Sequence, residues 1–248
     1  QAHRRTRLAK GLDVHPTTAD ALADARVNDE QALAIVGGVD ALPDDLHPDL
    51  KVKAEEHLIE LAKDYDAKIA VINAKELDYK QQVYDEFRKP ERLAEYLVFA
   101  QEVMDVTDRT VFNGKAGQAK LRDKVADKWR DFLKRYALAP KPHAALIAWN
   151  RFAKLPAAEF AAKAASIAQE LAKPEGGCTP EIAAEFTKAA PKSMKDVAGV
   201  YAKIILDGKL EPVRQLMQDK LSPMAIPVEG ADAFFTRKDL ETVVRIKN

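Results

Sequence analysis

The residues from Asp49 to Lys89 contain no proline and no glycine, and their apolar residues recur at steps of three and four. Such spacing places the apolar side chains on one face of an α-helix, while lysines and glutamates occupy the opposite face. The pattern predicts a helix of about 60 Å at 1.5 Å per residue, whose apolar face packs against a partner helix. That face consists of Leu58, Leu61, Tyr65, Ile69 and Ile72, and it resumes with Tyr79, Val83 and Phe87. The series breaks at residues 76–82, where we expect a kink or a break.

Helices are also predicted before and after this segment. Residues 12–47 have the pattern of two or three short helices, one of which starts at Asp29 and ends at Gly37-Gly38. Pro48 is well placed at the first position of the long helix, and Pro90 starts the next helix, which runs to about residue 105. The glycine-containing residues 113–117 predict a flexible connector. A further helix then follows at about 118–137.

From Pro140 onward prolines are more frequent and the predicted helices are shorter. These helices cover residues 142–154, 156–173, about 180–190, about 194–207, 211–221 and 237 to the end. Ser193 and Thr236 each precede an acidic residue by three positions, which is the spacing of a capping box. We see no strand pattern and no repeat of fixed period.

These patterns together predict an all-α protein. We expect an N-terminal segment with short helices at residues 1–47 and a long helical hairpin or coiled-coil arm at 48–137. A compact bundle of short helices should follow at 138–248.

Composition and charge exclude some classes of function. The chain has 39 basic and 39 acidic residues, whereas domains that chiefly bind nucleic acid are usually basic. No apolar run reaches the length of a transmembrane helix, so we expect no membrane insertion. The basic residues 1–10 have no interleaved aromatic side chains, and we expect them to form a solvated terminal arm. The chain opens at Gln1, as we would expect of a fragment or a processed product.

The search for metal and haem ligands finds few candidates. Glu55, Glu56, His57 and Glu60 lie close together in sequence, but a di-iron bundle needs two Glu-x-x-His motifs and none is present. Axial ligands for a non-covalent haem would have to come from residues on facing helices, namely His57, His143 or Met104. We therefore predict no metal site and no cofactor.

The search for catalytic side chains is equally short. Cys178, the only cysteine, lies at a predicted helix start, but no histidine is near it in sequence to activate the thiol. The only serines are Ser166, Ser193 and Ser222, and none occupies a Gly-x-Ser-x-Gly motif. No catalytic residue is predicted. The large aromatic residues at helical spacing are expected to anchor the core rather than to bind a cofactor: Trp129, Tyr136, Trp149 and Phe152.

Several segments follow one another in an order that resembles a known protein family. They are Lys89-Pro-Glu-Arg-Leu-Ala-Glu-Tyr96, Lys128-Trp-Arg-Asp-Phe-Leu133, His143-Ala-Ala-Leu-Ile-Ala-Trp149, residues 152–163, Pro191-Lys-Ser-Met-Lys-Asp-Val-Ala198 with Tyr201, and Ser222-Pro-Met-Ala-Ile-Pro227 followed by Phe234-Phe235. This order resembles the middle helical region of large planctomycete proteins that join a cytochrome-c-like domain to two domains of unknown function. The resemblance covers residues 50–248 and implies an exported, multi-domain parent in the cell envelope. It implies no catalytic residue, and any haem would belong to the cytochrome domain of the parent.

The function expected on these grounds is that of a non-catalytic scaffold or docking module, which contacts other domains of the parent or a partner protein through its helical faces. Two alternatives remain open. The chain could be an accessory part of an envelope redox or polysaccharide-processing enzyme whose active site other domains complete, with His143 and Trp149 at the interface. It could also be a ligand-binding bundle. The sequence predicts neither the partner nor the oligomeric state.

Overall fold

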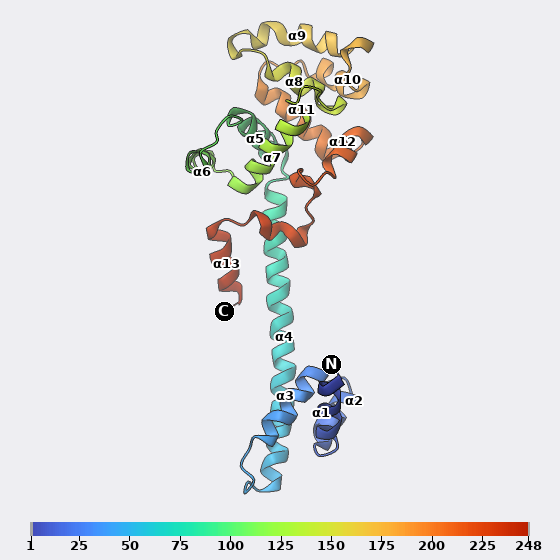
Figure 1. Cartoon of the computed structure of the whole chain (residues 1–248), viewed down its shortest axis with the longest axis vertical. Helices are drawn as coiled ribbons and strands as arrows, with labels where there is room; N and C mark the ends of the chain where they lie inside the picture. Colours follow the sequence, from blue (N-terminus) through green and yellow to red (C-terminus); the bar gives the residue numbers. More distant parts are fainter. Residues whose placement is uncertain (1, 248) are drawn as a thin grey trace. The chain divides into compact units, whose positions relative to one another are not determined.

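The computed structural model describes residues 2–247 and is all-α, with no strand in that range (Figure 1). This confirms the predicted fold class. The α-helices are α1 (Ala2–Leu12), α2 (Pro16–Ala23), α3 (Asp29–Asp40), α4 (Pro48–Glu86), α5 (Pro90–Glu102), α6 (Arg109–Gln118), α7 (Asp123–Tyr136), α8 (Ile147–Ala153), α9 (Phe160–Leu171), α10 (Pro180–Ala189), α11 (Met194–Asp207), α12 (Glu211–Met217) and α13 (Arg237–Lys247). Short 3₁₀ helices are η1 (Ala144–Leu146), η2 (Ala157–Glu159), η3 (Pro174–Gly176), η4 (Pro223–Ala225) and η5 (Val228–Phe234).

The chain forms two compact units, residues 1–75 and 76–248, and α4 supplies residues to both. The predicted borders at 47/48 and 137/138 therefore differ from the border between the compact units. One reason is that α7, expected to return along the long helix, packs instead against α5. Another is that the first turns of α4 bury side chains among α1 to α3 and so belong to the first unit.

The first unit has a small apolar core. Its members come from α1 to α4 and the α2–α3 connection: Leu8, Ala21, Val27, Ala32, Ile35, Val39 and Ile59. At Gly11, α1 approaches α3 so closely that a Cβ atom would lie 2.4 Å from the Cγ1 atom of Val36. A larger residue at position 11 would therefore separate the two helices.

The second unit is organised around α5, which packs against both α7 and α11 (Figure 1). Its core is rich in fully buried aromatic side chains, which include Trp129, Trp149, Tyr201, Phe152 and Phe186. Neighbouring rings meet at centroid distances of 5 to 6 Å, for example 5.6 Å between Trp149 and Tyr201. Burial of several large rings is the dominant apolar contribution to a core of this kind.

Most predicted helix starts are confirmed because local residues determine them. Pro48, Pro90 and Pro180 each occupy the first position of a helix. Ser193 accepts a hydrogen bond from the backbone N–H of Asp196 at 3.2 Å, as an N-cap residue does. Thr236 likewise accepts from the N–H of Asp239 at 3.4 Å.

Two predicted interruptions are wrong because tertiary burial outweighs the local preference of glycine. Gly37-Gly38 lies inside α3, which continues for one more turn because Val39 is buried. Residues 113–117 are helical and belong to α6, whose start is capped by the carboxylate of Asp108 and which buries Phe112 and Ala116. The glycines lower intrinsic helix propensity by about 1 kcal/mol each, a cost that the burial of a phenylalanine exceeds.

The break considered at residues 76–82 does not occur, since these residues are helical within α4. The border between the two compact units nevertheless falls at the start of this segment, between Lys75 and Glu76.

The side of α4 that faces the first unit's core also differs from the prediction. The buried residues are Glu55 and Ile59, with Leu58 and Ala62 partly buried beside them. Farther along, Leu61 and Tyr65 are 49% and 63% exposed. The predicted apolar face is therefore largely open to solvent between Leu61 and Ile72, whereas its later members Val83 and Phe87 are buried.

Candidate functional site

The glutamates and histidine that the sequence places together do not form a site. Glu55 is buried and points to α2, whereas Glu56, His57 and Glu60 are exposed on α4. No group of three His, Cys, Asp or Glu side chains able to hold a metal ion occurs among residues 6–247, whose side chains the structure describes. Consecutive residues of a helix project in different directions, so adjacency in sequence did not bring these side chains together.

Glu55 instead takes part in a buried polar cluster of the first unit. Its Oε1 atom accepts hydrogen bonds from the backbone N–H of Thr18 at 2.5 Å and from the hydroxyl of Thr18 at 2.6 Å. The ring of His15 lies between two carboxylates: Nε2 is 2.9 Å from Asp40 Oδ1, and Nδ1 is 3.8 Å from Glu55 Oε2. The carboxylate of Glu55 thus caps the first turn of α2 from another helix.

The residues considered as haem ligands have structural roles or are exposed. His143 caps η1, where its Nδ1 atom accepts from the N–H of Ala145 at 3.2 Å. Met104 packs against the core of the second unit, and His57 is exposed.

The large aromatic residues behave mostly as core anchors. Trp129, Trp149 and Phe152 are buried, while Tyr136 is only partly buried. The indole N–H of Trp149 donates to the side-chain oxygen of Gln101 at 2.9 Å. Trp149 and His143 therefore both have partners within the second unit.

The three serines lack the surroundings of a nucleophile. Ser193 caps α11, and Ser166 is exposed on α9. Ser222 is buried, but its hydroxyl donates to the sulfur of Met217 at 3.7 Å and accepts from the N–H of Met224 at 3.1 Å. These contacts cap η4 and leave the hydroxyl without a neighbouring base.

Cys178 is partly buried beside the core of the second unit, and burial raises the pKa of its thiol. Hydrogen bonds to the backbone of Ala148 and Thr179 lower the pKa by less than burial raises it. The reactive thiolate is therefore disfavoured at neutral pH, which is the opposite of what a catalytic cysteine needs.

We expect native Cys178 to react with iodoacetamide at pH 7.4 more slowly than in the unfolded chain, because burial raises the pKa of its thiol and so lowers the fraction of reactive thiolate. Mass spectrometry of timed samples, with and without guanidinium chloride, measures both rates. A native rate equal to or above the unfolded rate would show that the thiol is activated.

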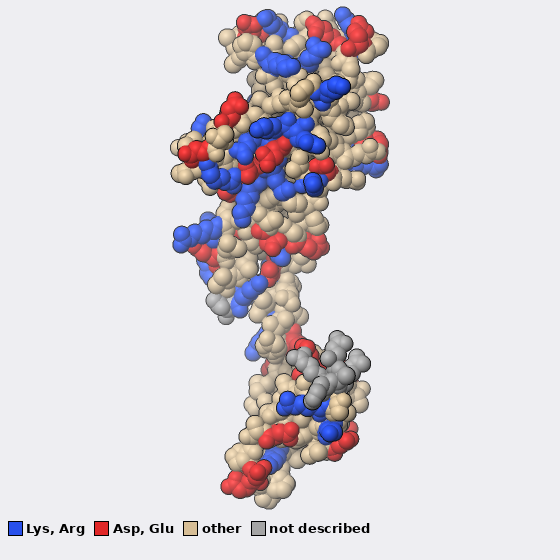
Figure 2. All heavy atoms as spheres, viewed as in Figure 1, with Lys and Arg blue, Asp and Glu red and all other residues tan. Residues whose placement is uncertain are grey.

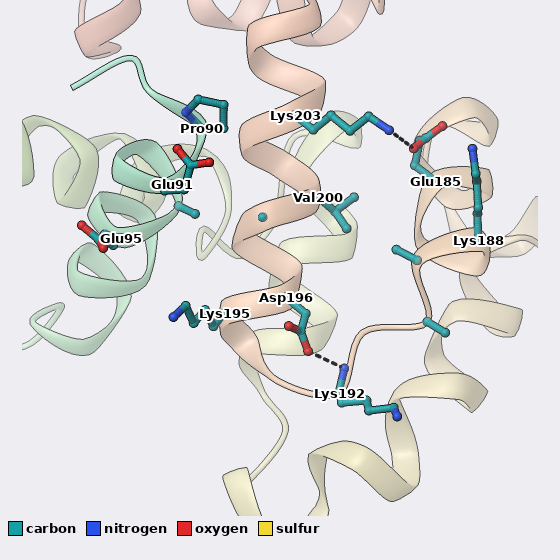
Figure 3. A pocket seen from close by; sticks show the side chains of 14 residues that line it. Pro90, Glu91, Glu95, Glu185, Lys188, Lys192, Lys195, Asp196, Val200 and Lys203 are labelled. Carbon is teal, nitrogen blue, oxygen red and sulfur yellow. Dashed lines mark hydrogen bonds and ion pairs between the residues drawn. The ribbon is translucent and has the colours of Figure 1, made fainter. Parts of the chain in front are cut away.

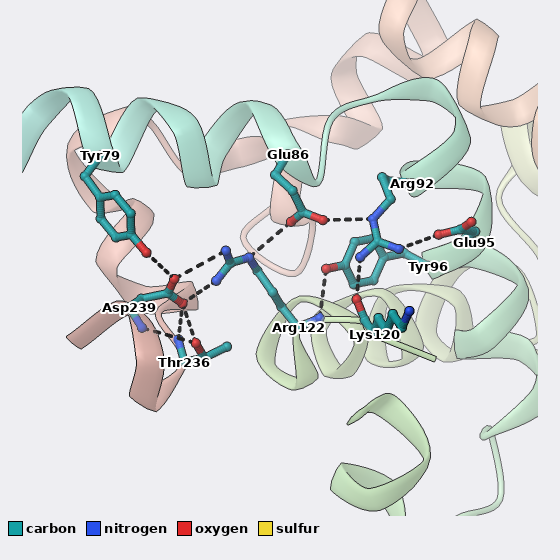
Figure 4. A network of polar contacts seen from close by, with 9 residues as sticks. All are labelled: Tyr79, Glu86, Arg92, Glu95, Tyr96, Lys120, Arg122, Thr236 and Asp239. Carbon is teal, nitrogen blue, oxygen red and sulfur yellow. Dashed lines mark hydrogen bonds and ion pairs between the residues drawn. The ribbon is translucent and has the colours of Figure 1, made fainter. Parts of the chain in front are cut away.

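A charged network joins four segments of the second unit (Figure 4). Asp239 is 4% exposed and accepts hydrogen bonds from the hydroxyl of Tyr79 at 2.6 Å, from the N–H and hydroxyl of Thr236 at 2.6 Å each, and from the guanidinium of Arg122. The other side of the Arg122 guanidinium donates to Glu86 Oε2 at 3.1 Å. Asp239 therefore connects α13 to α4 and to the start of α7.

The network continues from Glu86 to α5. The Nε atom of Arg92 donates to Glu86 Oε1 at 2.8 Å, and its guanidinium also donates to the backbone oxygen of Lys120 at 2.5 Å. The hydroxyl of Tyr96 accepts from the N–H of Arg122 at 2.9 Å. Each charged group in the centre of the network is thus paired with a charged or polar neighbour.

Electrostatics in this network favour the ionised forms of its charged groups. Burial raises the pKa of Asp239, but the hydrogen bonds from Arg122, Thr236 and Tyr79 lower the pKa by more than burial raises it. The resulting pKa is about 2. Burial raises the pKa of Tyr96 above its usual range. Neither Asp239 nor Tyr96 titrates near neutral pH, and the hydrogen bonds of both hold segments of the second unit together.

The second unit also has an open groove, lined by α5, α11, and α10 with the connection that follows it (Figure 3). Its volume is about 950 Å³. The floor has small residues, including Ala94, Ala189 and Gly199, and lysines and carboxylates line its edges. No histidine, cysteine or serine is among the residues that line it.

On the wider surface, lysine and arginine side chains are interspersed with aspartate and glutamate on the face shown in Figure 2. Each helix within residues 2–247 is too short or too polar to traverse a lipid bilayer.

Sequence reasoning missed the two polar clusters and the groove. Glu55 and Thr18 are 37 residues apart, and Arg122 and Asp239 are 117 residues apart. No local spacing rule connects such positions. Glycine at position 199, inside a predicted helix, was the one sequence signal that could have pointed to the groove.

Comparison of the chain with models of protein families, with curated proteins and with solved structures finds no match.

Proposed function

We propose that the chain is a non-catalytic interaction module that docks onto another domain or protein through the apolar face of α4. The exposure of that face carries the proposal: Leu61 and Tyr65 are 49% and 63% exposed, and Ile69 and Ile72 on the same side are only partly buried. Regularly spaced apolar side chains on one side of a helix are the anchors by which helices bind one another. The face extends beyond the small core of the first unit, and its residues are not required for the packing of that core.

The side chains around this face support a protein partner rather than a lipid one. Lys63, Asp64, Asp66 and Lys68 are all exposed on the same turns of α4, so both signs of charge flank the apolar residues. Mixed flanking charges of this kind select a partner helix and its direction in helical pairs. They do not form the basic belt that interfacial membrane helices use.

The place of the module in a larger protein is part of the proposal. The order of segments between Lys89 and Phe235 resembles that of planctomycete proteins with a cytochrome-c-like domain. On this basis we propose that the chain belongs to an exported parent in the cell envelope, and that other domains of that parent are the first partners to test.

A photo-crosslinking amino acid at position 65, introduced in the cells that produce the protein, tests the α4 face. We expect a single defined crosslink from position 65, to another domain of the parent or to one partner protein. Position 63 is the matched control, because the Lys63 side chain projects about 160° away around the helix. Equal crosslinking from both positions, or none from position 65, would contradict the proposal.

A double variant, Tyr65→Lys with Ile69→Lys, separates docking from folding. We expect the free energy of unfolding of the chain to change by no more than about 0.5 kcal/mol, because Tyr65 is exposed and Ile69 is outside the core. The same variant should abolish the crosslink formed from a probe at position 72. Urea denaturation followed by circular dichroism measures the stability. A large loss of stability would mean that the face is already needed within the chain.

The non-catalytic part of the proposal has its own test. Native mass spectrometry of the purified chain, beside its denatured mass and its visible spectrum, detects any retained metal or haem. A stoichiometric bound metal or haem would contradict a purely docking role.

A further inference from the structure

We propose that α13 is a reversible strap on α4, and that a partner helix docking along α4 has to displace it. The proposal rests on the proposed function in one respect, because the competing helix is the partner of the α4 face. The attachment of α13 itself lies within the second unit. It can therefore be tested on the purified chain whether or not that partner exists.

Polar contacts towards its two ends hold α13 against α4. Near its start, Asp239 accepts a hydrogen bond from the hydroxyl of Tyr79 at 2.6 Å and pairs with the guanidinium of Arg122 (Figure 4). In its last turn, the ammonium group of Lys247 lies 2.8 Å from Glu76 Oε2. Positions 76 and 79 are three residues apart, so both contacts are made to one side of α4.

Apolar burial contributes little to this attachment. Asp239 is the one buried residue of α13, all of which the structure describes, whereas Leu240 and Val244 are 54% and 57% exposed. Val243 and Ile246 are partly buried. A helix of 11 residues is marginal in water by itself, so α13 depends on its docking to stay helical. Elements with few buried apolar contacts open separately from the rest of a fold.

Release of α13 leaves no buried charge unpaired in the remainder of the unit. When Asp239 moves away, Arg122 keeps Glu86, whose Oε2 atom lies 3.1 Å from the guanidinium. Glu76 likewise keeps Lys80, at 3.5 Å. The large penalty that follows when one partner of a buried ion pair is lost therefore does not oppose the opening.

The part of α4 that α13 covers continues the proposed docking face. Along the chain, Glu76 and Tyr79 follow Ile72 at steps of four and three, a spacing that keeps side chains on one side of a helix. The open stretch from Leu61 to Ile72 is about 17 Å long. A helix that is stable by itself has about 12–15 residues and a length of roughly 20 Å, so it would extend to Glu76 and meet α13.

The docked strap and the partner therefore exclude each other on α4. The chain binds its partner through the fraction of molecules in which α13 is released. Docking of α13 lowers the apparent affinity of the α4 face by that fraction, and a bound partner in turn favours the released state. The contact between α13 and α4 is in this sense autoinhibitory.

Hydrogen exchange of the purified full chain, measured by mass spectrometry at the resolution of single amides, tests the opening. We expect the amides from Leu240 to Ile246 to share one degree of protection, lower than that of α7 and α11. Nitration of Tyr79 by tetranitromethane reports the same opening from the side of α4. Protection that decreases gradually towards the end of α13, with Tyr79 unreactive, would show simple fraying and would overturn the proposal.

Substitution of Lys247 with Glu replaces the attraction to Glu76 by repulsion. Arg245→Glu is the matched control, because Arg245 is exposed in the same last turn and forms no ion pair within the part of the chain that the structure describes. The two variants change net charge and the interaction with the helix dipole equally. We expect Lys247→Glu to raise both α13 exchange and Tyr79 nitration about fivefold above the control. Equal effects of the two variants would overturn the proposal.

The competition is measured by the photo-crosslink from position 65, in cells that express the chain at a level where less than half of it is crosslinked. Lys247→Glu should raise the yield at least about twofold, and Arg245→Glu should leave it unchanged. An unchanged yield in Lys247→Glu, beside faster exchange of α13, would overturn the competition. A crosslink missing from every variant would contradict the proposed function and the competition, whereas hydrogen exchange decides independently whether α13 opens.

Discussion

Substitution of Asp239 with Asn is expected to lower the free energy of unfolding of the second unit by about 3 kcal/mol. The side chain is 4% exposed and accepts hydrogen bonds from Arg122, Tyr79 and Thr236. An amide of the same shape keeps part of the hydrogen bonding but removes the negative charge that faces the guanidinium of Arg122. Glu86, which also pairs with Arg92, is then the one carboxylate left beside Arg122. Guanidinium chloride denaturation, followed by tryptophan fluorescence of Trp129 and Trp149, reports on this unit.

The same substitution should change the response to acid. The folded-state pKa of Asp239 is about 2, below the ordinary value of 3.8. Its contribution is therefore present above about pH 4 and is lost as the pH falls toward 2, by about 2 kcal/mol in total. The Asp239→Asn variant should lack this part of the acid-induced loss of stability. Carboxylates whose pKa values are also lowered, Glu76 and Asp219, remain in both proteins.

The matched control is Asp232→Asn, which removes an exposed carboxylate from η5 in the same part of the chain. Its stability should stay within about 0.5 kcal/mol of the wild type at every pH between 2 and 7. If Asp239→Asn behaved like this control, the network around Arg122 would not stabilise the second unit.

Substitution of Glu55 with Ala is expected to lower the stability of the first unit by about 3 kcal/mol, since it leaves a buried N–H and a buried hydroxyl without an acceptor. Both groups belong to Thr18, which is fully buried. The change also removes a carboxylate from beside His15. The apolar core of this unit is small, so a loss of this size is a large fraction of its stability.

Hydrogen exchange measured by mass spectrometry distinguishes the two units. In the Glu55→Ala variant, peptides from α2 and α3 should exchange faster, while peptides from α5, α7 and α11 should keep the exchange rates of the wild type. Glu56→Ala is the control, because this neighbouring side chain is exposed. Unchanged protection of α2 in the Glu55→Ala variant would contradict the role assigned to the carboxylate.

The sequence was most informative where a few adjacent residues determine the structure. Proline at positions 48, 90 and 180 and the caps Ser193 and Thr236 mark helix starts correctly, because each acts on its own turn. The predicted connector at residues 113–117 was wrong because the burial of Phe112 and Ala116 depends on α5 and α7, which local preference does not include. The apolar face of α4 was recognised, but the small core that covers only its first turns was not.

The candidate sites were the least predictable part. Glu55 was grouped with Glu56, His57 and Glu60 because they are adjacent, yet its partners are Thr18 and His15 on a different segment. The groove depends on three helices whose packing no single segment encodes. Contacts between distant segments depend on the tertiary fold, and the local patterns of a single sequence do not predict them.

In each unit, residues that contact one another lie far apart in the sequence, and this separation affects how the chain folds during its synthesis. The polar cluster around Glu55 joins positions that are 37 residues apart, whereas Arg122 can pair with Asp239 only after a further 117 residues have been synthesised. At ordinary rates of translation this delay is on the order of ten seconds. During that time α5 is exposed, because its main partner α11 also comes late. We therefore expect the second unit to complete its apolar core only after η5, which supplies the last core residue Phe234, has left the ribosome.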